Sequence, residues 1–137
     1  MKILVVYDSL YGNTEKIAKS LEIGLKEAGI LTVCMNARDV AAADSLNQYD
    51  LIWLGALTHF MTASRLMKKF LGKLKSIDIS GKYGFAFDTK FDSRMSGSTT
   101  KFIEKELRNL GLQILSTRIC NSLWHGWNNW SNYYIVY

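Results

Sequence analysis

The sequence predicts an α/β fold in which five parallel strands form one sheet with helices on both faces. Short runs of apolar, β-branched residues, typical of strands buried on both faces, alternate with segments whose apolar residues recur every three or four positions. The 137 residues include 48% hydrophobic and 21% charged side chains, a balance typical of a globular protein. We expect one domain over residues 1–137, because this length supports a single core.

The same alternation gives the expected elements in order. Strands are predicted at residues 3–7, 30–35, 50–55, 83–88 and 112–117. Helices are predicted from the segment around Glu15 up to a stop at Gly29, at 64–75 and at 98–110, with one or two helical turns within 39–48. Right-handed crossovers between parallel strands fit the order 2-1-3-4-5, and ligands of such sheets bind beyond the carboxyl ends of strands one and three.

The loop at residues 9–14, Ser-Leu-Tyr-Gly-Asn-Thr, joins the first strand to a helix. The first N–H groups of a helix have no intrahelical partner and lie at the positive end of its dipole, so this segment favours an anion. The Ser9 and Thr14 hydroxyls could add donors, and Gly12 and Asn13 tolerate the backbone twist that directs N–H groups at a phosphate. Without a following Lys or a Gly-x-Gly-x-x-Gly, the loop suits a monophosphate. The alternative is an ordinary turn capped by Thr or Asn.

Residues 9–15, Ser-Leu-Tyr-Gly-Asn-Thr-Glu, resemble the FMN phosphate loop of the flavodoxin family, whose pattern is Ser/Thr-x-Thr-Gly-Asn-Thr. The sequence departs from that pattern at Tyr11, where flavodoxins usually carry Thr or Ser. A Tyr at this position is more similar to the related NAD(P)H:quinone oxidoreductases. The resemblance implies an FMN phosphate site formed by Ser9, Leu10, Tyr11, Gly12, Asn13 and Thr14.

The end of the third strand resembles the second flavin loop of the family, which often reads Gly-Ser-Pro-Thr before an aromatic residue. Here Leu57 stands where Pro is common, and Thr58, His59 and Phe60 follow it. The resemblance implies that Thr58 hydrogen-bonds the ribityl chain or the ring edge, and that His59 or Phe60 stacks on the ring. The alternative is that Phe60 belongs to the core and His59 to the surface.

The end of the fourth strand is similar to the third flavin loop of short flavodoxins. The resemblance implies that backbone groups of Asp88, Thr89, Lys90 and Phe91 meet the pyrimidine edge, that Phe91 covers the ring, and that Gly97 belongs to the same loop. An acid near the ring would raise the energy of the reduced, anionic flavin, whereas Lys90 would lower it. An ordinary βα connection is the alternative. Three such loops after strands one, three and four, in that order, together favour FMN binding.

The resemblance covers residues 1–117 and does not include the tail. In the family the last strand leads into a helix beside the first one, whereas residues 118–137 place Trp124, Trp127 and Trp130 among Asn, a poor helix former. We therefore expect the face of the first helix to be poorly covered, or covered by a second copy in a homodimer formed through this aromatic tail. Alternatives are a helical aromatic stripe on the sheet, a base-stacking surface, which would lack basic residues, and a frameshifted sequence.

Composition limits the partners and the location. Residues 1–60 carry five Lys/Arg against seven acids, and residues 61–137 carry twelve against five. Because lysines at helix surfaces are usually solvated, we predict no nucleic-acid partner. No stretch approaches the roughly 18 apolar residues that span a membrane, and no signal-peptide pattern occurs, so we expect a cytoplasmic protein without membrane contact. Cys34 and Cys120 are isolated and are predicted to be free, buried thiols.

The predicted function is therefore that of an FMN-binding, flavodoxin-like protein that carries single electrons between redox partner proteins. We predict no catalytic residue and no metal site. One alternative is an FMN-dependent NAD(P)H:quinone reductase, which Tyr11 and His59 favour. The other is a module with this fold that no longer binds flavin.

Overall fold

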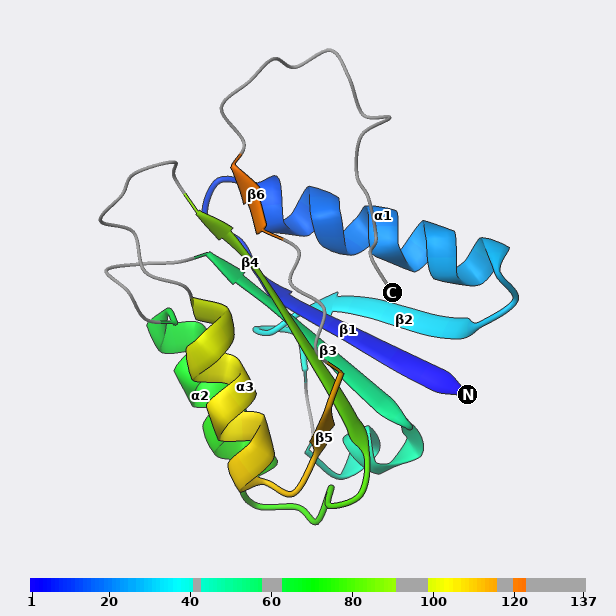
Figure 1. Cartoon of the computed structure of the whole chain (residues 1–137), viewed down its shortest axis with the longest axis vertical. Coiled ribbons are helices and arrows are strands. Elements are labelled where there is room, and N and C mark those ends of the chain that lie inside the picture. Colours follow the sequence, from blue (N-terminus) through cyan, green and yellow to red (C-terminus); the bar gives the residue numbers. More distant parts are fainter. Residues whose placement is uncertain (41–42, 58–62, 91–98, 116–119, 123–137) are drawn as a thin grey trace.

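The computed structural model describes residues 1–40, 43–57, 63–90, 99–115 and 120–122, and these form a parallel sheet between two layers of helix (Figure 1). The strand order is β2-β1-β3-β4-β5, as the sequence predicts. All neighbouring strands run parallel, because helices connect successive strands across the faces of the sheet. The strands are β1 (Lys2–Asp8), β2 (Leu31–Asn36), β3 (Leu51–Leu57), β4 (Tyr83–Lys90) and β5 (Gln113–Ile114).

Helices cover both faces of the sheet, which confirms the predicted three-layer architecture. α1 (Asn13–Glu27) lies on one face, and α2 (Arg65–Leu74) and α3 (Thr99–Asn109) lie side by side on the other (Figure 1). The helical turns predicted before the third strand form a 3₁₀ helix, η1 (Ala43–Gln48). In the part of the chain that the structure describes, no helix is long and apolar enough to cross a membrane.

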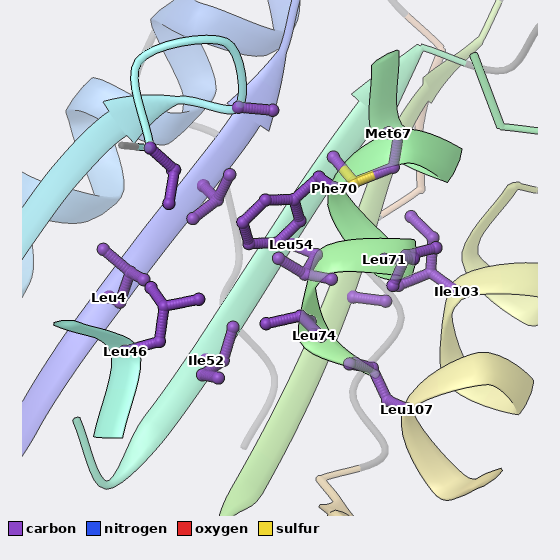
Figure 2. Packing of buried hydrophobic residues seen from close by; sticks show 14 of the residues in the cluster. Leu4, Leu46, Ile52, Leu54, Met67, Phe70, Leu71, Leu74, Ile103 and Leu107 are labelled. Atoms are coloured by element: carbon purple, nitrogen blue, oxygen red, sulfur yellow. The ribbon is translucent and has the colours of Figure 1, made fainter. Parts of the chain in front are cut away.

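The larger core lies between the sheet and the pair α2 and α3 (Figure 2). Alternate residues of the central strands face it, because successive side chains of a strand point to opposite sides of the sheet. α2 and α3 contribute the apolar stripes that the sequence predicts. The fully buried residues shown with labels are Leu4, Leu46, Ile52, Leu54, Met67, Phe70, Leu71, Leu74, Ile103 and Leu107.

A second core lies between the sheet and α1. Ile17, Ala18 and Leu21 of α1 pack against the other alternate set of strand residues, which includes Trp53 and Phe85. The rings of these two aromatic residues meet edge to face, with centroids 4.4 Å apart. Among the described residues, α1 is the only helix on this face.

The fifth position of the sheet differs from the single strand predicted over residues 112–117. β5 pairs with the start of β4, and a separate strand, β6 (Cys120–Ser122), pairs with its end, Asp88–Lys90. Five residues separate Ile114 from Cys120, whereas three separate their partners Gly84 and Asp88. The segment between Ile114 and Cys120 is thus two residues longer than the matching segment of β4, which prevents a continuous parallel ladder. The predicted extent of the fifth strand is therefore wrong, whereas its predicted place beside β4 is confirmed.

Candidate functional site

The carboxyl ends of β1, β3 and β4 meet at one edge of the sheet. Asp8, Ala56 and Asp88 lie opposite one another in the strand registers. The loops that follow these strands therefore begin next to each other, as the sequence predicts for a ligand site in an open parallel sheet.

The N-terminus of α1 lies at this edge and is not capped by a side chain of any described residue. Its N-cap is Gly12, whose φ of 83° lies in the left-handed region that favours glycine. The first helical hydrogen bond runs from the N–H of Lys16 to the carbonyl of Gly12, at 3.0 Å. The N–H groups of Asn13, Thr14 and Glu15 consequently have no intrahelical partner and lie at the positive end of the helix dipole, which favours an anion. The predicted alternative of a Thr or Asn cap is wrong, because Gly12 occupies the N-cap position.

Ser9 presents a polar group that the described part of the chain does not satisfy. Its hydroxyl oxygen is buried and has no hydrogen-bond partner there. Leaving a hydroxyl in this state costs about 1–3 kcal/mol, so a ligand that accepts its hydrogen bond would be stabilised. A phosphate monoester fits this position, because it offers oxygens to Ser9 and to the uncapped N–H groups of α1 together. Leu10 and Tyr11, in the same loop, are exposed, at 68% and 66%.

A pair of hydroxyls holds the first turn of α1 on the sheet. The Oγ atoms of Thr14 and Thr89 lie 2.7 Å apart, and both residues are almost fully buried. Either oxygen can donate in this hydrogen bond. The contact fixes the start of α1 against β4 and thereby links the predicted phosphate loop with the strand that leads into the predicted third flavin loop.

Tyr7 holds the carboxylate in the first turn of α1. Its hydroxyl donates to Oε1 of Glu15 at 3.0 Å. Burial, followed by this hydrogen bond and the charge of Glu15, raises the pKa of Tyr7 to about 12. Tyr7 therefore keeps its proton at neutral pH and remains a donor to Glu15 in the first turn of α1.

Asp8 connects the end of β1 to α2. Its Oδ2 accepts a hydrogen bond from the hydroxyl of Ser64, and the same hydroxyl oxygen accepts from the N–H of Met67 at 3.1 Å as the N-cap of α2. Sequence reasoning did not identify this contact. The only local signal was a Ser at the expected helix start, which is a common capping residue.

Gly55 provides space for a large neighbour. It lies between Tyr7 and Phe87 in the strand registers. A Cβ atom built on Gly55 would lie 2.0 Å from Cζ of Phe87, so only glycine leaves room for this fully buried ring beneath the site. In the sequence, Gly55 indicates only the end of the third predicted strand, and this contact has no local signal.

The residues predicted for the second and third flavin loops are only partly described. Leu57 ends β3 and is partly buried, whereas Thr58, His59, Phe60, Phe91 and Gly97 lie outside the described residues. Asp88 and Thr89 are buried within β4, between β3 and β6. Oδ2 of Asp88 accepts from the N–H of Thr100 at 3.4 Å, at the start of α3. The contact of backbone groups from Asp88 to Phe91 with the pyrimidine edge of the flavin remains a prediction.

No metal site is found in the described ranges, where no group of three or more His, Cys, Asp or Glu residues gathers. Cys34 is a free thiol, as the sequence predicts, but it is half-buried rather than buried. Burial raises the pKa of Cys34 to about 11, which makes it a weak nucleophile at neutral pH. The side chain of Cys120 is not described.

The fold places the ends of three strands and an uncapped helix N-terminus at one edge of an open parallel sheet, an arrangement typical of α/β proteins that bind a ligand there. A model of the flavodoxin family, described as "Flavodoxin", matches residues 5–123. The chain belongs to the flavodoxin family. The match confirms the predicted family, whose members bind FMN and transfer electrons to redox partner proteins.

Individual relatives agree with this assignment. The chain is similar to a flavodoxin of Clostridium saccharobutylicum, with 34% identity over 89 residues that cover 65% of this chain and 56% of the relative. It is also similar to a protein of Methylocella silvestris named NAD(P)H dehydrogenase (quinone), with 30% identity over 83% of this chain and 69% of the relative. The solved structure of a flavodoxin from the domain Archaea matches with a TM-score of 0.79 and 27% identity, covering 88% of this chain and 84% of that one.

Proposed function

We propose that this chain holds FMN at the carboxyl edge of its sheet and passes single electrons between a donor and an acceptor protein. The observation that carries the proposal is the buried hydroxyl of Ser9, which lacks a hydrogen-bond partner among the described residues and lies in the loop before the uncapped N-terminus of α1. An uncapped helix start alone is common, but a buried unsatisfied hydroxyl beside it indicates a bound acceptor.

The residues of the chain would divide the binding between phosphate and ring. Ser9 and the first N–H groups of α1 would hold the phosphate, with Gly12 supplying the backbone turn. The bond between Thr14 and Thr89 would keep these donors in place before FMN arrives, so little ordering is needed on binding. The ring contacts are proposed for Leu57, Thr58, His59, Phe60, Asp88, Thr89, Lys90, Phe91 and Gly97.

When bound, FMN supplies the one-electron chemistry, and the protein sets the ease of reduction through the charges near the ring. The proposed role of Lys90 is electrostatic: a cation at this edge favours the reduced, negatively charged cofactor. Tyr7 acts on the neighbouring Glu15, whose charge it partly offsets by donating a hydrogen bond.

An NAD(P)H:quinone reductase is the second candidate function. The relative with that name in Methylocella silvestris and the exposed Tyr11 in the phosphate loop favour it. A reductase must admit a nicotinamide and a quinone to the same ring, whereas a carrier needs only an exposed ring edge. The two functions therefore differ in a steady-state assay.

The test is a visible spectrum of the purified chain before and after FMN is added, followed by turnover measurements. Flavin absorption with quenched fluorescence of the added FMN is expected, and unquenched FMN with a flat spectrum of the chain would refute the proposal. Steady oxidation of NAD(P)H with a quinone by the FMN-loaded chain would decide for the reductase. Slow NAD(P)H oxidation, with electrons passing readily to a second redox protein, would decide for the carrier.

We further propose a cytoplasmic location, which the free thiol of Cys34 supports because reducing compartments keep thiols free. The homodimer predicted through the aromatic tail remains a prediction, since residues 123–137 lie outside the described residues.

A further inference from the structure

The positive charge of this chain is concentrated on one of its two helical layers. Residues 65–75 and 99–109, which contain α2 and α3, hold eight Lys or Arg against two Glu, a net charge of +6. The whole chain has a net charge of +5. The remaining residues therefore carry nine cations against ten acids and contribute −1.

The cations on these helices form two stripes. Arg65, Lys68 and Lys69 lie three and four positions apart on α2, which contains no acid. Lys101, Lys105 and Arg108 lie four and seven positions apart on α3. Residues with these spacings share one side of a helix, and all six side chains are exposed. We call these six residues the basic face.

Contacts between α2 and α3 join the two stripes into one surface. The Nζ atom of Lys68 lies 5.7 Å from the ring centroid of Phe102. Nζ of Lys75, just after α2, lies 3.4 Å from Oε2 of Glu106. One of the two acids in this layer is thus already paired, and the basic face retains its charge.

The basic face begins at the edge of the sheet that carries the candidate FMN site. The N-cap of α2, Ser64, is hydrogen-bonded to Asp8 at the end of β1, and the N–H of Thr100 in the first turn of α3 donates to Asp88 near the end of β4. Arg65 and Lys101 lie within three residues of the starts of their helices. The ends of the basic face that carry these two cations are therefore the ends nearest to the proposed FMN site.

At the starts of both helices this charge pattern opposes helix stability, whereas Arg108 in the last turn of α3 favours it. Cations in the first turn oppose the helix dipole, and like charges three or four positions apart cost a few tenths of a kcal/mol per pair. Neither α2 nor α3 has an acid in its first turn. A pattern that helix stability disfavours at both helix starts indicates a role in binding.

We propose that the basic face docks an acidic redox partner protein and brings it to the edge of the sheet where electrons leave or enter. The inference rests on the proposed electron-carrier function and adds the charge of the partner and the surface that it uses. A concentrated charge of one sign raises the rate of encounter with an oppositely charged protein by about 10- to 1000-fold at low ionic strength.

A protein partner fits this surface better than a nucleic acid. Single-stranded nucleic acids are held by exposed aromatic side chains as well as by cations. The aromatic residue that α2 and α3 place beside these cations, Phe102, is half-buried next to Lys68. The position of the basic face beside the candidate FMN site is also what an electron donor or acceptor requires.

The test measures the affinity of the chain for a labelled acidic ferredoxin, a small negatively charged iron–sulfur protein, over a range of ionic strengths. The variant Lys101→Gln/Lys105→Gln removes two charges from the basic face. The matched control, Lys19→Gln/Lys26→Gln, removes two lysine charges from α1 on the opposite side of the sheet, and Gln has nearly the same helix propensity as Lys. Circular dichroism and FMN titration on each variant check folding and cofactor binding separately.

We expect the affinity of the unmodified chain to fall steeply with salt, the Lys101/Lys105 variant to bind about tenfold more weakly at low ionic strength, and the control to remain within about twofold. An equal loss in both variants, or an affinity independent of salt, would overturn the proposal. So would binding of a random single-stranded oligonucleotide without binding of the ferredoxin. Because docking is measured without electron transfer, a chain that fails to bind FMN would refute the proposed function and still test the docking surface.

Discussion

Replacing Ser9 by Ala should separate the stability of the chain from its affinity for FMN. The Ser9 hydroxyl is buried, and within the described residues it has no hydrogen-bond partner. Its removal relieves a desolvation cost of about 1–3 kcal/mol, so we expect the free energy of unfolding of the FMN-free chain to stay unchanged or to rise by about 1 kcal/mol. The same substitution deletes a hydrogen bond to a charged phosphate, worth about 1.5–3 kcal/mol, and should weaken FMN binding by about ten- to a hundredfold.

Urea unfolding of the FMN-free chain and FMN fluorescence titration measure the two effects of Ser9→Ala independently. Ser20→Ala is a suitable control, because Ser20 lies on α1, is exposed, and donates its hydroxyl proton to the carbonyl of Lys16. Both quantities should be nearly unchanged in this control. If Ser9→Ala instead lowered the free energy of unfolding by more than about 1 kcal/mol and left the FMN affinity intact, the hydroxyl would have a structural partner, and the reasoning about the phosphate site would fail.

Three further substitutions test the surroundings of the site. Gly55→Ala should lower the free energy of unfolding, measured with urea, by about 1–3 kcal/mol, because the new Cβ overlaps the ring of Phe87. Adding Phe87→Leu should restore most of this loss. A double variant that is no more stable than Gly55→Ala would contradict the overlap. Thr89→Val should cost about 1–3 kcal/mol by leaving the hydroxyl of Thr14 buried and unpaired, while Thr14→Val/Thr89→Val should cost less than Thr89→Val alone; a double variant less stable than Thr89→Val would contradict the pairing. Gly12→Ala should lower the free energy of unfolding by about 1 kcal/mol because of the positive φ alone, since the new Cβ meets no described atom within 4 Å. The affinity for FMN should fall in the same fluorescence titration. Unchanged values of both quantities would contradict this prediction and show that the loop adapts.

Much of the fold could be predicted because its signals are local. Strands buried on both faces show as continuous apolar runs, and the helices show as apolar stripes, so the element order and the strand order 2-1-3-4-5 were predictable. The fifth strand was not, because its extent depends on register against β4. Two extra residues between Ile114 and Cys120 interrupt that ladder, and a single run of sequence gives no sign of the mismatch.

In the candidate site, only the loop after the first strand has a local signal in the sequence. The loop of Ser9 to Thr14 carries its signal in six consecutive residues. The contacts that support the loop are not local: Thr14 meets Thr89 75 positions away, and Asp8 meets Ser64 56 positions away. Such pairs join residues whose types are common everywhere in proteins, so only the folded chain identifies them.

The most direct test of the central claim compares the affinities of this chain for FMN and for riboflavin, which differ only in the phosphate. If Ser9 and the N-terminus of α1 hold that phosphate, FMN should bind about a hundredfold or more tightly than riboflavin, since two hydrogen bonds to a charged group contribute at least about 3 kcal/mol. Equal affinities for the two flavins, or no binding of either, would contradict the account.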